Sequence, residues 1–266
     1  MRCNLTRHAR RARTRWGSRD TAQEKAKTPF ENRAANHRPV EFRTRRSTIL
    51  QEATLNSNKT SGGSGRAGGT GPVVYFDMSV SLDGYVNDKT GGLQWHRVDG
   101  ELFRHFIDND RENGGHIYGR KLYESMLFWE TAFENPDAAE VMKDEQMQEY
   151  TRIWKSIPKL VVSRTLTEVT GNAELVNADL KSAVESFKAQ STGNISVGGP
   201  TLAASLARLG LVDEFRLYIT PVVIGGGTPF FLPELAGLEL DPIESRQFAN
   251  GVTMLRYACT TRGDAG

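Results

Sequence analysis

Short apolar runs rich in β-branched residues alternate with segments of helical spacing from about residue 72 onward. The first run, VVYFDMSVSLDGYV, begins as a strand and stops at Asp83-Gly84, a pair that favours a turn. In GELFRHFIDNDRE the apolar residues recur at i, i+3 and i+4, which predicts an amphipathic helix. The apolar face of that helix carries Leu102, Phe103, Phe106 and Ile107.

The middle of the chain repeats an order of strand, turn and helix. HIYGRKLYESML predicts a short strand, a glycine and a helix, whereas KLVVSRTL and NISVGG predict compact strands followed by turns. DLKSAVESFKAQ predicts a helix that begins at Asp179 or Leu180. A further, leucine-rich helix is predicted from Leu202 to Leu209.

Strands dominate the last part of the chain. Three segments there predict strands without helices between them: EFRLYITPVVIGGGTPFF, LELDPIESRQF and VTMLRYACTT. This order predicts an α/β fold with a mixed, mostly parallel central sheet, covered by helices and finished by an antiparallel hairpin at one edge. Residues 72–262 have the length of one domain.

The charge of the chain divides at the same boundary. Residues 1–71 hold 16 Lys and Arg against 5 Asp and Glu, whereas the rest of the chain holds 18 against 27. The first segment lacks a sustained apolar period and ends in SGGSGRAGGTGP, so we predict a disordered basic tail with a Gly/Ser linker. A nucleic-acid-binding arm, an organelle transit peptide and a start codon placed too early all remain open as explanations of this tail.

Several protein classes are excluded by composition. No apolar run reaches the roughly 18 residues that span a bilayer, and no apolar signal segment follows the basic start. The two cysteines, Cys3 and Cys259, cannot supply a disulfide framework or a cysteine zinc cluster. We therefore expect a cytoplasmic protein without a metal site.

A glycine pair marks the strongest candidate for a binding site. A strand at Ile195–Val197 is followed by Gly198-Gly199 and then by Pro200-Thr201, which open the leucine-rich helix. Proline suits the first helical turn, and glycines before it allow an anion to approach the free N–H groups there. A simple tight turn is the alternative, since the longer G-x-G-x-x-G pattern is absent.

Two other strand ends carry groups that suit an anion. Gly119 and Arg120 follow the strand in IYGRKLYES, and Ser163 and Arg164 follow the strand in LVVSRT. Arginine pairs with phosphate through two parallel hydrogen bonds. Because the carboxyl ends of parallel strands share one edge, three such ends together predict a dinucleotide site, although an arginine by itself is more often a surface charge.

The motifs MSVSLDGYV, YGRKLYE, LVVSRTL, SVGGPTLAASLARLGLVDEFRLYITPVVIGGGTPFF and LRY, in this order, resemble the reductase domain of the dihydrofolate reductase superfamily. The resemblance is closer to the C-terminal reductase domain of the bifunctional riboflavin-biosynthesis deaminase/reductase, and it covers about Val73 to Thr261. It implies a three-layer α/β/α fold with NADPH lying across the carboxyl edge of the sheet. The residues that it assigns to the cofactor are Gly119, Arg120, Ser163, Arg164, Gly198, Gly199, Pro200, Thr201 and Leu202.

The resemblance also implies a proton donor, a single carboxylate at the start of the first long helix. Glu101 occupies a similar place, shortly after Trp95, and Thr220 resembles the strand threonine that hydrogen-bonds such an acid. Asp99 or Asp83 is an alternative for the position. A carboxylate at a helix start is also routine, because it complements the helix dipole.

We predict an NADPH-dependent oxidoreductase that transfers a hydride to a small heterocyclic or carbonyl substrate. One alternative is a stand-alone reductase of riboflavin or pterin metabolism, for which Lys89 and Arg97 are the candidate phosphate-binding cations. Another is a nucleotide-binding module without catalysis. The H-x-E and P-C-x-x-C elements of a zinc deaminase are absent. We expect a homodimer in which IGGGTPFF covers an edge strand, and nucleic-acid binding only through the basic tail.

Overall fold

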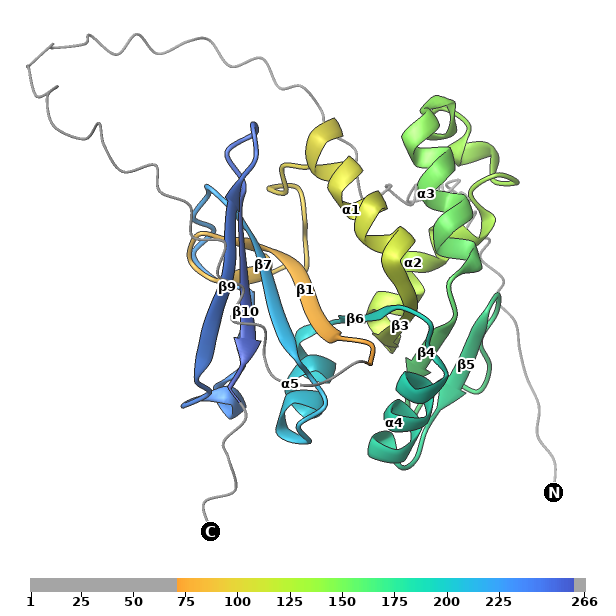
Figure 1. The fold of residues 1–266 in the computed structure, drawn as a ribbon. Helices are drawn as coiled ribbons and strands as arrows, with labels where there is room; N and C mark the ends of the chain where they lie inside the picture. Colours follow the sequence, from red (N-terminus) through yellow and green to blue (C-terminus); the bar gives the residue numbers. More distant parts are fainter. Residues whose placement is uncertain (1–70, 261–266) are drawn as a thin grey trace, which may run out of the picture.

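The computed structural model describes residues 71–260, and the predicted tail and linker lie outside the described residues. Strands alternate with helices along most of this range, as the apolar pattern predicts (Figure 1). The strands are β1 (Val74–Ser81), β2 (Tyr85–Asn87), β3 (Asn113–Gly119), β4 (Lys159–Val162), β5 (Ala173–Val176), β6 (Asn194–Gly198), β7 (Glu214–Thr220), β8 (Thr228–Pro229), β9 (Leu240–Gln247) and β10 (Thr253–Cys259). The helices are α1 (Gly100–Glu112), α2 (Arg120–Thr131), α3 (Glu145–Ser156), α4 (Leu180–Gln190) and α5 (Pro200–Arg208).

Eight strands form one sheet in the order β5-β4-β3-β6-β1-β7-β10-β9. The strands from β5 to β7 are parallel, and β10 runs antiparallel to both of its neighbours. The mostly parallel sheet with a hairpin at one edge is therefore confirmed. Strands β2 and β8 pair separately, beside the end of β1.

Helices cover both faces of the sheet, which makes three layers (Figure 1). Alternate residues of the central strands, such as Val74, Phe76 and Ile195, face the layer of α4 and α5 and form the largest apolar core. On the other face, aromatic side chains such as Trp129 and Trp154 fill the space beside α2 and α3. Leu102 of α1 packs on β7 and β10 there, as its predicted helical face requires.

The polar residues of the central strands all lie on the face of α1, α2 and α3. Asp77 of β1, His116 of β3 and Ser196 of β6 alternate with the apolar core positions of the same strands. Central parallel strands are normally apolar on both faces. A polar patch at this depth therefore indicates a site rather than a core.

Three details differ from the predicted elements. The sequence patterns did not indicate α3 or β5. The segment after β7 is not a continuous strand, because Pro221 has no N–H and the backbone at Gly225, Gly226 and Gly227 has positive φ.

No helix within residues 71–260 has the length and apolar character to span a bilayer.

Candidate active site

The three predicted strand ends meet at one edge of the sheet. Gly119 at the end of β3 pairs with Val162 at the end of β4, and Tyr118 pairs with Gly198 at the end of β6. Strands β4, β3 and β6 are neighbours in the sheet. The groups that the sequence suggested for a dinucleotide are therefore brought together by the fold.

The helices at this edge begin without a side-chain cap. Helix α2 starts after Gly119 and α5 starts after Gly199, and neither residue has a side chain to bond the free N–H groups of the first turn. The other three helices are capped by aspartates: Asp99, Asp144 and Asp179. The two uncapped turns therefore keep N–H donors for a ligand, and these donors suit the phosphates of a dinucleotide.

The two glycines of the turn have different structural reasons. A Cβ atom on Gly198 would overlap Leu122 Cδ2 and lie 2.9 Å from the ring of Tyr118, so these side chains would have to shift to admit it. Gly199 has φ +100°, and a Cβ atom on it would meet nothing within 4 Å. The Cβ position of Gly199 therefore lies in open space, whereas that of Gly198 lies against packed side chains.

The polar groups that follow β3 and β4 have different partners. The Ser163 hydroxyl accepts hydrogen bonds from the backbone N–H groups of Thr165 and Leu166, at 3.1 and 3.0 Å, and so shapes the turn itself. Arg120 lies 3.9 Å from Glu124, one turn along the exposed side of α2. Arg164 is exposed in the turn after β4. Both arginines are accessible to an anion at this edge.

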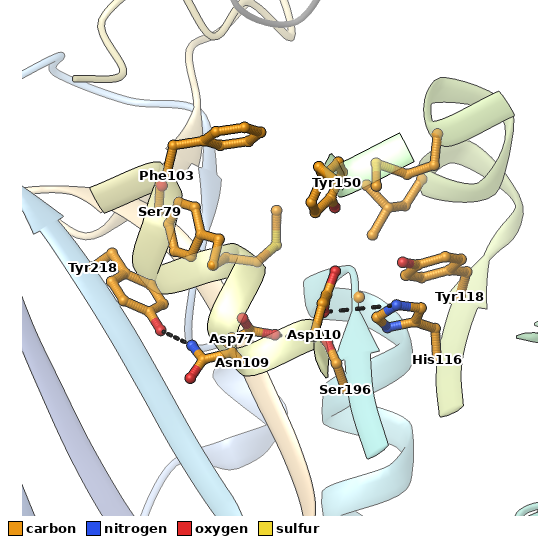
Figure 2. Close-up of a pocket in the computed structure, with 15 residues that line it drawn as sticks. Asp77, Ser79, Phe103, Asn109, Asp110, His116, Tyr118, Tyr150, Ser196 and Tyr218 are labelled. Carbon is orange, nitrogen blue, oxygen red and sulfur yellow. Dashed lines mark hydrogen bonds and ion pairs between the residues drawn. The ribbon is translucent and has the colours of Figure 1, made fainter. Parts of the chain in front are cut away.

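A cavity of about 170 Å³ lies between the sheet and the helices α1, α2 and α3 (Figure 2). Aromatic side chains line much of it, among them Phe103, Phe106, Tyr118 and Tyr150. Gly198 also lines the cavity. The cavity therefore reaches the glycine turn at the start of α5.

Asp77 forms one part of the cavity wall. Its Oδ1 atom accepts a hydrogen bond of 2.8 Å from the Ser196 hydroxyl. Arg216, which pairs with Asp77 in the register of β1 and β7, lies over the ring of Tyr75 and bonds Glu214. Burial raises the pKa of Asp77, and the Ser196 hydrogen bond and the charge of Arg216 oppose that rise.

Asp110 of α1 is a second carboxyl group in the cavity. Its Oδ1 atom accepts a hydrogen bond of 2.9 Å from Asn113 Nδ2, and it also bonds the Tyr150 side chain. Burial and then the nearby charge of Asp77 raise the pKa of Asp110 to about 7. Near neutral pH this group is therefore divided between its acid and its carboxylate form.

His116 is buried in the same cavity without a hydrogen bond to either ring nitrogen from the described residues. Its Nε2 atom lies 3.7 Å from Asp110 Oδ1, which is beyond hydrogen-bond distance (Figure 2). Burial, and less strongly the charge of Lys159, lower the pKa of His116 to about 3. The imidazole is therefore neutral, with one donor and one acceptor available.

The predicted proton donors do not line this cavity. Glu101 accepts hydrogen bonds from Arg246 Nη2 at 3.2 Å and from Ala249 N at 3.0 Å, and so connects α1 to the segment around the end of β9. Asp99 caps α1 by accepting a bond of 2.9 Å from Leu102 N. The catalytic role predicted for Glu101 stays a prediction.

The two other predicted catalytic residues also lie apart from the cavity lining. Asp83 accepts hydrogen bonds from the backbone of Ile224 at 3.1 Å and of Gly225 at 2.8 Å. Desolvation raises the pKa of Asp83, but hydrogen bonds from the Ser81 side chain and then from these two N–H groups outweigh it and lower the pKa. Thr220 is buried at the end of β7, opposite Ser81 of β1. Asp83 therefore holds the glycine loop after β7.

Asp77, Asp110 and His116 were not singled out from the sequence, although two of them leave a signal. Asp110 follows Phe103, Phe106 and Ile107 at i+7 from the first, so it lies on the apolar face of the predicted helix. Asp77 interrupts the apolar run of β1. A charged residue at a core position was the available indication.

Comparison with known proteins identifies a matching family and a relative. A family model described as the RibD C-terminal domain matches residues 72–254. The uncharacterized protein YyaP of Bacillus subtilis (strain 168) is 31% identical over 185 residues, which cover 69% of this chain and 93% of that protein.

Two solved structures show the same fold at lower identity. A putative riboflavin biosynthesis protein from Shewanella sp. PV-4 has a TM-score of 0.54 and 23% identity, over 71% of this chain and 99% of that one. A pyrimidine reductase-like protein from Corynebacterium diphtheriae has a TM-score of 0.50 and 14% identity, over 71% of this chain and 92% of that one.

The fold and these matches define a three-layer α/β domain with a mostly parallel central sheet. More particularly, the chain belongs to the RibD C-terminal domain family. The resemblance and the fold class predicted from the sequence are confirmed.

Proposed function

We propose that the chain is an NADPH-dependent reductase whose substrate binds in the cavity between the sheet and α1, α2 and α3. One observation carries the proposal: the cavity is lined by Gly198, and the next residue, Gly199, opens the uncapped helix α5. A substrate in the cavity would thus lie next to the helix start that suits the phosphates of a dinucleotide. When bound, NADPH supplies the hydride.

The residues present at the sheet edge fit such a cofactor. Gly199 leaves open space where a Cβ atom would otherwise stand, and the first turns of α2 and α5 keep their N–H donors. Arg164 and Arg120 supply exposed positive charge on the neighbouring strand ends. This charge suits the 2′-phosphate that distinguishes NADPH from NADH.

The protein must also supply a proton at the reduced bond. Asp110 is a candidate because it lines the cavity and because its pKa of about 7 leaves part of it protonated at neutral pH. Glu101 is the candidate from the sequence, and it is bound to Arg246 and Ala249. The contacts favour Asp110 for donating the proton and Asp77 for orienting the substrate.

The volume and the lining of the cavity indicate the size and charge of the substrate. A small heterocyclic or carbonyl compound fits a volume of about 170 Å³. The cations that a phosphorylated riboflavin precursor would need, Lys89 and Arg97, are not among the residues that line it. An unphosphorylated substrate is therefore favoured over the riboflavin-pathway alternative.

The test is a titration of the purified chain with NADPH, followed by tryptophan fluorescence. The absorbance of the reduced nicotinamide is then followed with pyrimidinones, pterins, flavins and quinones. Binding with turnover supports the proposal. Binding without turnover on any compound favours the nucleotide-binding module, and no binding rules out the reductase. The predicted homodimer is a separate proposal, which sedimentation of the same sample tests.

A further inference from the structure

Carboxyl groups are the charged groups in the cavity wall. Asp77 and Asp110 both line it, whereas no Lys or Arg of the described chain does. Asp77 accepts a hydrogen bond from the Ser196 hydroxyl through Oδ1, and its carboxyl group lines the cavity. Arg216 lies behind this carboxylate, but it is bonded to Glu214. The cavity therefore presents negatively charged hydrogen-bond acceptors to a ligand.

His116 supplies a second and independent indication of a ligand. Its side chain is 3% exposed, lines the cavity and has two unpaired ring nitrogens. A buried polar group without a partner costs about 1–3 kcal/mol, a cost that a bound partner removes. The ring is stacked on Tyr118 at a centroid distance of 5.2 Å, so it cannot simply turn toward another group without losing that contact. A ligand with hydrogen-bonding groups beside Asp110 would supply the partners that the ring nitrogens of His116 lack.

The size and walls of the cavity suit a ligand with one ring. An apolar cavity of roughly 150 Å³ is known to hold one benzene molecule, and this cavity has about 170 Å³. Phe103, Phe106 and Tyr150 provide apolar walls for the faces of a ring. Asp77, Asp110 and His116 provide polar contacts for its substituents (Figure 2).

We propose that this cavity is a cation-selective subsite, which takes a single ring carrying an amidinium or a protonated amino group and rejects a ring carrying a carboxylate or phosphate. The proposal rests on the proposed function only in that the ring is a part of the substrate. Asp77 and Asp110 are the residues that determine this selectivity. An anionic ring would place like charge beside two carboxyl groups in a water-poor space, where such repulsion is strong.

Three matched probes test the proposal: benzamidinium, benzamide and benzoate, which share one ring and differ in charge. Their binding to the full chain is measured by isothermal titration calorimetry at about pH 8, where Asp110 is mostly ionised. We expect benzamidinium to bind at least about tenfold more tightly than benzoate, with benzamide between them. Equal affinities, tighter binding of benzoate, or no binding of any probe would overturn the proposal.

Variants locate the binding. Asp77→Asn should weaken benzamidinium by about tenfold or more and reduce its advantage over benzoate, since it removes a charged acceptor. Asp108→Asn is the matched control, because Asp108 is exposed on α1 and pairs with Arg111 outside the cavity. If Asp77→Asn does not fold, as judged by circular dichroism, Asp110→Asn replaces it. Equal weakening in the variant and the control would place the cation elsewhere and overturn the proposal.

The outcome is separable from that of the proposed function. Selective benzamidinium binding in a protein that does not bind NADPH supports the subsite and refutes the reductase. Turnover of anionic rings, with no preference for benzamidinium, supports the reductase and refutes the subsite.

Discussion

Asp110 Oδ1 lies 3.7 Å from His116 Nε2, so a buried acid and a buried base face each other without a hydrogen bond. The imidazole is neutral, because burial lowers its pKa to about 3. It therefore provides no positive charge that would keep Asp110 ionised. The groups that favour the carboxylate are the hydrogen bonds from Asn113 and Tyr150 and the charge of Lys159, and they are outweighed by burial and Asp77.

The raised pKa of Asp110 predicts a pH dependence of stability. In the folded state the pKa is about 7, against 3.8 for an ordinary aspartate, so the folded protein holds an extra proton between these pH values. Stability from this group is therefore complete below about pH 4 and declines as the pH rises through about 7, by up to about 4 kcal/mol. Asp110→Asn should remove this decline, measured as the free energy of urea unfolding at several pH values.

The control for this experiment is Asp108→Asn on the exposed side of the same helix, which should follow the wild-type pH profile. A wild-type decline that persists unchanged in Asp110→Asn would show that other groups cause it.

Two carboxyl groups compete for the role of proton donor. If Asp110 donates the proton, Asp110→Asn should lower kcat by about 10²-fold, the lower range for general acid catalysis, with little change in NADPH affinity. Glu101→Gln tests the donor predicted from the sequence, and its loss should be the smaller one. The measurement is kcat with the best substrate of the panel. A larger loss in Glu101→Gln would restore Glu101 as the donor.

The glycine turn should respond differently at its two positions. Gly199→Asp should abolish NADPH binding, because it places a side chain and a negative charge in the open space before α5. The positive φ also costs stability, on the order of 1–3 kcal/mol. Gly210→Asp shares the positive φ and the open surroundings at the other end of α5, so it should have a similar stability cost and normal binding.

Gly198→Ala completes this comparison. It should destabilise the fold by about 1–3 kcal/mol, because its Cβ atom would overlap Leu122. Fluorescence titration and thermal melting separate the two effects. Tight NADPH binding by Gly199→Asp would mean that the turn serves the backbone alone.

Arg164 should determine the choice of cofactor. Arg164→Ala should weaken NADPH by about 1.5–3 kcal/mol, the range for a hydrogen bond to a charged group, and should leave NADH unchanged. The matched control is Arg208→Ala, an arginine in the last turn of α5. Equal losses for the two cofactors would show that Arg164 holds a group that both share, and no loss would make it a surface charge.

The elements predicted from the sequence are those whose burial follows a clear period. Leu102, Phe103 and Ile107 mark α1 because one face of that helix packs on the sheet. Helix α3 buries Thr151 beside Trp154, and the Thr151 hydroxyl donates a hydrogen bond to the backbone oxygen of Met147, one turn earlier in the same helix. Its mixed polar and aromatic face gives a weaker apolar period. Strand β5 has four residues at the edge of the sheet, too few for an alternation to be distinctive.

One part of the candidate site was likewise predictable from the sequence, and another part was not. The carboxyl edge was predictable because parallel strands must end together, and glycine or arginine follows three of them. The cavity was not, because its floor is formed by Asp77, His116 and Ser196 from three strands that are distant in the chain. Which face each residue takes depends on register, and register depends on the packing of the whole sheet.

The central position of β1 has a consequence for biosynthesis. Val73 N bonds Asn194, 121 positions later, and Val74 N bonds Asp213, 139 positions later. At a translation rate of about 5–20 residues per second, β1 waits on the order of 10 s for either neighbour. During that time both edges of an apolar strand are unpaired in the nascent chain. A ribosome that stalls before β7 is complete would thus expose the unpaired edges of β1, a kind of surface that chaperones recognise. The time at which β1 is protected from aggregation therefore depends on the synthesis of the last third of the chain, which contains β6 and β7.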